Sequence, residues 1–159
     1  MKTKINATDI NNAHLKSFNR FESRAFHEDT IFSEIYCEEG SEIIEAEFYD
    51  CTFKNCKCFG ISFTRGIFKN CQFLNCDLGS IAIMNSSFRD VKFTDTKLTG
   101  VQWADASMPL DVNFTDCLLN YGGFINVDLA LATSRSGCTN SAMRDSWAKG
   151  KSNSLGIFS

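Results

Sequence analysis

Residues 46–105 divide without a gap into twelve blocks of five: AEFYD CTFKN CKCFG ISFTR GIFKN CQFLN CDLGS IAIMN SSFRD VKFTD TKLTG VQWAD. The third position of every block is apolar, and the first position is small or β-branched. Because these two positions are two residues apart, extended backbone places both on the same side of the chain. The fifth position is Asp, Asn, Gly or Ser in eleven of the twelve blocks, which favours a turn there.

A strict period of five fits neither an α-helix nor a long strand. Each block is instead a very short strand followed by a corner. One block cannot bury its own apolar residues, so successive turns of the chain must stack on one another. The sequence therefore predicts an all-β solenoid with a narrow, filled interior. The large residues predicted to fill it are Phe48, Phe53, Phe63, Phe68, Phe73, Leu78, Ile83, Phe88, Phe93, Leu98, Trp103, Phe114, Leu119, Phe124 and Leu129.

The pattern resembles the pentapeptide-repeat family, whose blocks begin with a small residue, continue with Asp or Asn, and have Leu or Phe third. The resemblance covers roughly residues 41–131. It implies a right-handed quadrilateral β-helix with four blocks per coil, here about four to six coils. The second position departs from the family pattern, since only Asp77 fits its preference. Four blocks per coil would stack residues twenty apart, such as Phe53, Phe73 and Phe93, at about 4.8 Å per step.

The repeat divides the chain into three parts. Residues 1–42 keep only a loose period near five and are predicted to form an irregular N-terminal coil or cap, because a solenoid end must cover its exposed edge. Residues 43–131 form the β-helix, with a register slip near 109–111 where Pro109 interrupts the ladder. For residues 132–159 three interpretations stay open: degenerate repeats, a short capping helix around 141–149, or a disordered tail.

The eight cysteines raise the question of a disulfide or metal site, but their pattern favours the core. Spacings of five and twenty do not match the paired cysteines of zinc sites. A reducing cytosol disfavours disulfides between stacked thiols. Cys56 and Cys58 are both predicted to point inward, and we expect no metal and no cofactor. Five cysteines occupy the small first position, where a buried thiol behaves as a small hydrophobe: Cys51, Cys56, Cys71, Cys76 and Cys117.

The charge of the chain is unevenly distributed. The formal net charge is −3, with −4 in residues 1–45 and +1 in residues 46–105. A nucleic-acid binder should show a basic stripe, so we expect no direct contact with nucleic acid. No apolar run approaches 18 residues, and the start MKTKINATDINN has no apolar signal segment. These features predict a cytoplasmic protein without membrane association.

Four apolar side chains fall at outward positions of the repeat. Singly exposed hydrophobic residues are normal on protein surfaces, so one interpretation is that they are scattered. The alternative is that they form part of a contact face for a partner. The residues of this candidate contact face are Phe59, Ile67, Leu74 and Met84.

The sequence shows no catalytic constellation: no Gly-rich phosphate loop, no nucleophile elbow and no metal motif. His14 and His27 lie in the irregular N-terminal part without a nearby ligand pattern, and we interpret both as surface or cap residues. A filled solenoid also leaves no internal pocket, so we expect no enzyme activity. The leading hypothesis is a non-catalytic scaffold that binds an unknown protein partner, as a monomer or a homodimer.

The resemblance implies an alternative function. Some pentapeptide-repeat proteins, including the Qnr-type quinolone-resistance proteins, bind DNA gyrase and topoisomerase IV, and acidic rod-shaped members are thought to mimic the DNA duplex. Such mimicry needs a strongly negative surface in place of phosphates. The charge of +1 on residues 46–105 departs from that requirement. A type II topoisomerase, with protection against quinolones or toxins, is therefore the alternative partner.

The predicted register can be tested by placing a charge at an inward position. Phe73→Asp should unfold the protein, because an unpaired carboxylate cannot be buried in an apolar core without a large cost. Asn75→Lys, two residues away at a corner, should change the melting temperature far less. An unchanged melting temperature for Phe73→Asp would show that the register is wrong.

Overall fold

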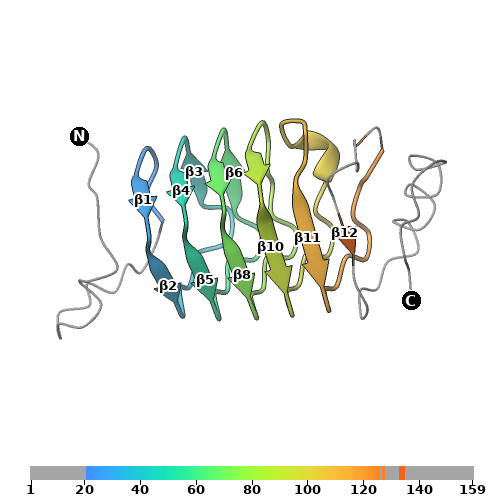
Figure 1. The fold of residues 1–159 in the computed structure, drawn as a ribbon, viewed down its shortest axis with the longest axis horizontal. Helices are drawn as coiled ribbons and strands as arrows, with labels where there is room; N and C mark the ends of the chain where they lie inside the picture. Colours follow the sequence, from blue (N-terminus) through green and yellow to red (C-terminus); the bar gives the residue numbers. More distant parts are fainter. Residues whose placement is uncertain (1–20, 126, 128–132, 135–159) are drawn as a thin grey trace.

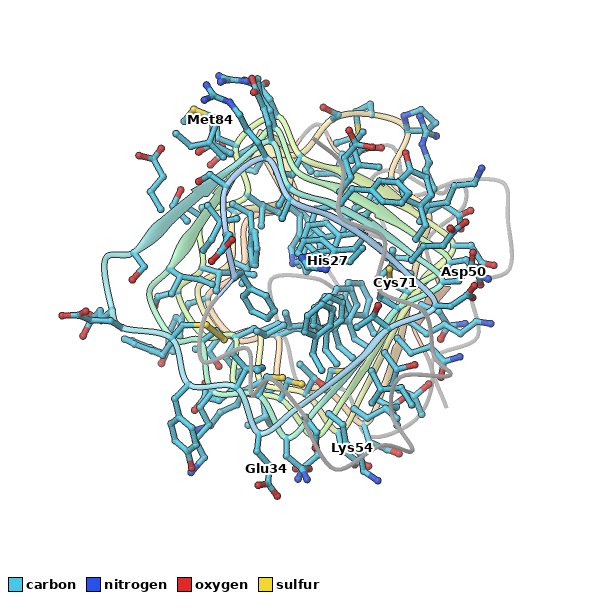
Figure 2. The ribbon with its side chains drawn as sticks, turned by 90° about the vertical axis from the view of Figure 1, so that its left-hand side faces the viewer. His27, Glu34, Asp50, Lys54, Cys71 and Met84 are labelled. Carbon is cyan, nitrogen blue, oxygen red and sulfur yellow. A yellow bond between two sulfur atoms is a disulfide. The ribbon has the colours of Figure 1, made fainter. Side chains whose placement is uncertain are left out.

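The computed structural model describes residues 21–125, 127 and 133–134, which form a stack of coils (Figure 1). Each coil consists of four short runs joined by corners, so the stack has four sides along its length (Figure 2). The predicted all-β solenoid is confirmed. In chain order its elements are β1 (Phe26–Glu28), β2 (Ile31–Ser33), β3 (Glu42–Ile44), β4 (Glu47–Tyr49), β5 (Thr52–Lys54), β6 (Ser62–Thr64), β7 (Ile67–Lys69), β8 (Gln72–Leu74), β9 (Ser87–Arg89), β10 (Val91–Thr94), the 3-10 helix η2 (Trp103–Asp105), β11 (Val112–Thr115) and β12 (Thr133–Ser134).

The four sides differ in how continuously their strands pair. The first side is the sheet β1-β4-β7-β9, and the second is the sheet β2-β5-β8-β10-β11-β12. Sheets of four and six strands agree with the prediction of four to six coils. The fourth side begins with β3 and β6, continues through Ala82, and carries η2 one coil later. The third side is joined by isolated parallel bridges that link Tyr36, Lys57, Asp77, Lys97 and Leu118 in succession.

Parallel pairing sets each residue opposite its equivalent in the next coil. Phe53 lies opposite Phe73, and Phe73 opposite Phe93, which confirms the predicted spacing of twenty. Five coils begin at residues 25, 46, 66, 86 and 106. The first and the last contain one extra residue, since Phe32 pairs with Phe53 and Phe93 pairs with Phe114. The slip predicted near 109–111 is therefore present, and a second slip lies between residues 37 and 42.

The corners explain the residue preference at the fifth position. Their backbone is left-handed, with φ between 49° and 67° from Asp50 to Asp95. Asn, Asp and Gly adopt this conformation most readily, and other residues at a cost of about 1–2 kcal/mol. Arg65 and Tyr121 also adopt left-handed backbone at corners, with φ of 53° and 60°, although neither is Asn, Asp or Gly.

The interior is filled by aromatic rings stacked from coil to coil. Along the second side, Phe53 and Phe73 have centroids 4.3 Å apart and planes within 5°, and Phe73 and Phe93 follow at 4.9 Å. Fourteen of the fifteen residues predicted to fill the core are buried, and Leu129 lies outside the described residues. Trp103 is fully buried among the rings of the first, second and fourth sides.

The N-terminal part begins the solenoid earlier than residue 43. Strands β1 and β2 pair in parallel with β4 and β5, so residues 25–42 already form a coil. Phe21 covers its open end, with ring centroids 5.4 Å from Phe32 and 5.8 Å from Phe48. Residues 1–20 and 135–159, and with them the helix considered around 141–149, lie outside the described residues. Within the described part of the chain, no helix is long and apolar enough to cross a membrane.

The left-handed corners can be tested at Asn85, where φ is 55° and the side chain is exposed. Asn85→Val should lower the free energy of unfolding by about 1–2 kcal/mol, because a β-branched side chain clashes with the backbone in this conformation. Asn85→Gly should stay close to the wild type. Chemical denaturation of both variants measures the difference, and Ala82→Val, on the neighbouring run, controls for added bulk. Equal stabilities of the Val and Gly variants would contradict the assignment of this corner.

Candidate functional site

The structure separates the four residues of the candidate contact face. Ile67 lies on the first side and Leu74 on the second, Phe59 on the third and Met84 on the fourth. A single contact face built from these four residues is therefore wrong, because successive outward positions turn a corner every five residues. Ile67 and Leu74 are also partly covered, whereas Phe59 and Met84 are 48 % and 54 % exposed.

Phe59 has a structural role on its own side. A β-carbon added at Gly79 would lie 3.0 Å from the Phe59 ring, so the ring rests directly over this glycine of the next coil. Gly79 thus provides the space that an outward-pointing Phe occupies. Phe59 packs against the solenoid and is only partly available to a partner.

A polar groove of about 340 Å³ follows the corner between the second and third sides. Asn75 Nδ2 donates to Asn55 Oδ1 at 2.9 Å, and Lys97 Nζ lies 3.5 Å from Asp77 Oδ2. Its charged groups balance, so the groove favours neither an anion nor a cation. The lining residues are Asn55, Lys57, Asn75, Cys76, Asp77, Asp95 and Lys97.

The groove is lined by carboxylate, amide and ammonium groups, and its thiol is held inside the core. Its one thiol, Cys76, is buried and donates to the backbone carbonyls of Phe53 at 3.5 Å and Leu74 at 3.4 Å. The hydrogen bond with Cys56, together with burial, raises the pKa of the Cys76 thiol, which keeps it protonated. Among the described residues, no group of three or more His, Cys, Asp or Glu side chains is placed to hold a metal ion.

The first-position cysteines are buried, as the repeat predicts. Each donates its S–H to a backbone carbonyl, as Cys71 does to Phe48 at 3.4 Å and Cys117 to Phe93 at 3.3 Å. Ser86 and Thr96 occupy the same position in other blocks and donate in the same way. The position therefore suits a small side chain with a hydrogen to donate, which explains why Cys, Ser and Thr recur there.

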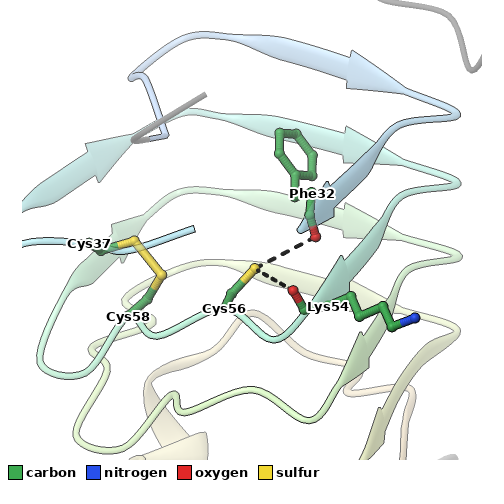
Figure 3. The surroundings of a disulfide bond; sticks show 5 residues. All are labelled: Phe32, Cys37, Lys54, Cys56 and Cys58. Carbon is green, nitrogen blue, oxygen red and sulfur yellow. Dashed lines mark hydrogen bonds between the residues drawn. A yellow bond between two sulfur atoms is a disulfide. The ribbon is translucent and has the colours of Figure 1, made fainter. Parts of the chain in front are cut away.

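One pair of cysteines forms a bond that the sequence did not predict. Cys37 and Cys58 form a disulfide that joins the first and second coils on the third side (Figure 3). Their Cα atoms are 4.6 Å apart, within the range that a disulfide spans. The expectation that Cys58 is simply a core thiol was wrong. Cys37 and Cys58 are 21 residues apart, and the first coil contains one extra residue between them. Because of this extra residue, both cysteines occupy the third position of a block and stack on each other.

His27 also differs from its expected place. It is buried at the third position of the first coil, where its ring stacks on Phe48 with centroids 5.2 Å apart. Burial lowers the pKa of His27, and the charge of Glu22 partly offsets this effect. His27 is thus a core residue of the end coil and not a surface residue, while His14 lies outside the described residues.

The charge is concentrated at one end of the solenoid. The first coil, residues 25–45, holds seven carboxylates and no Lys or Arg, whereas residues 46–105 sum to +1. Glu45 at its last corner binds Arg24 at 3.3 Å and Arg65 at 3.0 Å, and hydrogen bonds from Arg65 and then Arg24 lower the pKa of the Glu45 carboxyl. The seven carboxylates are Glu28, Asp29, Glu34, Glu38, Glu39, Glu42 and Glu45.

A second acidic feature runs along the solenoid. The corner between the first and second sides carries a carboxylate in four of its five coils, and Asn70 completes the row by donating to Asp50. We call this set the acidic corner row. The four carboxylates are 21, 40 and 21 residues apart in the sequence. The repeat predicts that they share one corner only if both register slips are taken into account. The residues are Asp29, Asp50, Asp90 and Asp111.

With the architecture established, the family can be assigned. A family model described as a pentapeptide repeat region matches residues 46–124, and these residues carry the five-residue register and the four-sided coil seen in the structure. The chain belongs to the pentapeptide-repeat family. No curated protein sequence matches this pentapeptide-repeat chain significantly.

Solved structures of QnrB1, described as a plasmid-mediated fluoroquinolone resistance protein, are similar to this pentapeptide-repeat protein. A trypsin-treated variant is 15 % identical, with 86 % of this chain and 70 % of that chain covered and a TM-score of 0.31. The full-length protein is 17 % identical, with 97 % and 95 % covered and a TM-score of 0.28.

We expect the Cys37–Cys58 disulfide to raise the free energy of unfolding measurably. In the chain-entropy model, closing a loop of this length stabilises the folded state by about 3 kcal/mol. Reducing agent should therefore lower the denaturant midpoint of the wild type, whereas the matched Cys37→Ala/Cys58→Ala variant should not respond. An equal response of the two proteins would show that this bond contributes nothing.

Proposed function

We propose that this pentapeptide-repeat protein is a non-catalytic scaffold that binds a partner protein through its outer sides. The observation that carries the proposal is the filled interior: stacked Phe rings and buried thiols occupy the space between all four sides. What the fold offers to other molecules is therefore its exterior, where side chains repeat at about 4.8 Å in straight rows. The pentapeptide-repeat family is generally non-catalytic, which agrees with this proposal.

The scaffold proposal is tested by quantitative affinity capture with the purified protein. We expect at least one partner whose capture saturates and is competed by excess untagged protein. Capture that neither saturates nor responds to competitor, in lysates of cells that express the protein, would contradict a binding role.

A second candidate is a type II topoisomerase as the partner, with the protein in the place of DNA. The acidic corner row favours it, since four carboxylates lie in one line along the solenoid, with Asn70 between the second and the third of them, and supply a series of negative charges. A DNA-binding surface attracts such a series as it attracts phosphates. The acidic first coil would add to this attraction at one end of the row.

The topoisomerase candidate is tested with gyrase supercoiling assays, with and without a quinolone. We expect inhibition or drug protection by the wild type that weakens in Asp29→Asn/Asp90→Asn, because Asn keeps the left-handed corner but removes two charges. Asp95→Asn/Asp116→Asn is the matched control, since it removes two charges from the next corner. No effect of the wild type, or equal effects of both variants, would contradict mimicry by the acidic corner row.

A further inference from the structure

The fourth side is the least charged surface of the solenoid. Its outward residues between the second and fifth coils are uncharged, with Met84 54 % exposed near the centre and Ile125 71 % exposed near the C-terminal end. Figure 2 shows Met84 at the outer edge of the coil, pointing away from the interior. Charged groups lie on this side at its margins, at Glu42 and along the corner to the first side. The outward residues are Ser62, Thr64, Ala82, Met84, Gln102, Ala104, Gly123 and Ile125.

The fourth side of one copy is complementary to the fourth side of a second copy when the two solenoids run antiparallel. A two-fold axis parallel to the strands, placed at the Met84 row, sets the second coil opposite the fourth coil of a second copy. The same rotation sets the first coil opposite the fifth coil of the second copy. Each residue then faces a residue that holds the same position of the five-residue block in the other copy. Met84 then meets its own equivalent, Thr64 meets Ala104, and Ile44 meets Ile125.

Charge and shape both support this pairing at the two flanking corners. On one corner, Arg65 of each copy, which also binds Glu45 of its own copy at 3.0 Å, lies opposite Asp105 of the other copy. Asp105 has no ion pair among the described residues. On the other corner, Tyr121, which is 84 % exposed, lies opposite Gly40. A β-carbon added at Gly40 would meet nothing within 4 Å, so there is open space for the Tyr ring.

The reversed arrangement also keeps the strongest like charges apart. The first coil carries seven carboxylates. An antiparallel pair of solenoids holds the two first coils at opposite ends, whereas a parallel pair would set them side by side. In a parallel pair Arg65 would also face Gly60, so the charge pairs of the reversed arrangement would be lost.

We propose that the fourth side is a self-complementary dimer interface, with two copies packed side by side and antiparallel about the Met84 row. This inference does not depend on the identity of the partner considered above. Five coils and five residues give a face of roughly 20 by 16 Å. Covering a face of these dimensions on both copies buries roughly 640 Å² in total, which is below the range of stable specific interfaces. The dimer is accordingly weak and depends on protein concentration.

The first test measures molar mass by light scattering and sedimentation from about 1 to 500 µM, a range suited to an interface of this size. We expect a concentration-dependent dimer. Met84→Lys should weaken it at least tenfold, because two ammonium groups would meet on the two-fold axis. Ile31→Lys is the matched control, since Ile31 is 52 % exposed on the second side. A monomer at every concentration, or a dimer that Met84→Lys leaves intact, would overturn the proposal.

The second test addresses the corner charges and the direction of packing. Asp105→Arg and Arg65→Asp should each weaken self-association, because each sets like charges opposite one another. Mixing the two variants should restore a heterodimer in which both pairs are complementary. A Met84→Cys variant should also form an intermolecular disulfide on mild oxidation, and Ile31→Cys should not. Failure of the mixed variants to associate while the wild type dimerises would contradict the antiparallel pairing.

Discussion

The structure depends on the stacking of one coil on the next in strict parallel register. Along the second side the centroids of successive Phe rings lie 5.0, 4.3, 4.9 and 5.5 Å apart, from Phe32 to Phe114. Each stacked pair adds about 0.5–1.5 kcal/mol beyond the area it buries. No single coil has this core, because every ring needs a neighbour above or below it. Stability is therefore shared between coils, and the end coils are its weakest part.

The first coil is an end coil, and it holds several residues that depart from the repeat. Among the described residues it has a neighbouring coil on one side only, and Phe21 covers its other end. It carries His27 where later coils have Phe, a disulfide where later coils have Leu, and seven carboxylates without a Lys or Arg. An acidic edge resists pairing with other strands, as natural sheet edges do. The disulfide and the ring of Phe21 tie this edge to the coil beneath it.

The outer surface follows a different logic from the core. Inward positions repeat because they must fit the same ring above and below, while outward positions need only tolerate their stacked neighbours. The sides and corners therefore differ in their exposed residues. One corner carries a row of carboxylates, the next has a polar groove with equal numbers of positive and negative groups, and the fourth side has an uncharged face. The outer surface therefore consists of rows in which side chains far apart in the sequence stand about 4.8 Å apart in space.

The sequence by itself determined the repeat, the inward residues and the corners, because these follow from local rules: period two for facing, and left-handed turns for Asn, Asp and Gly. It also showed the slip at Pro109. The tertiary structure decided what depends on the register between coils. One extra residue before Ile43 brings Cys37 over Cys58, and four outward apolar residues, similar in the repeat, end on four different sides. Such neighbours are set by the sum of all residues in a coil, so an unrecognised insertion of one residue changes every contact between that coil and the next.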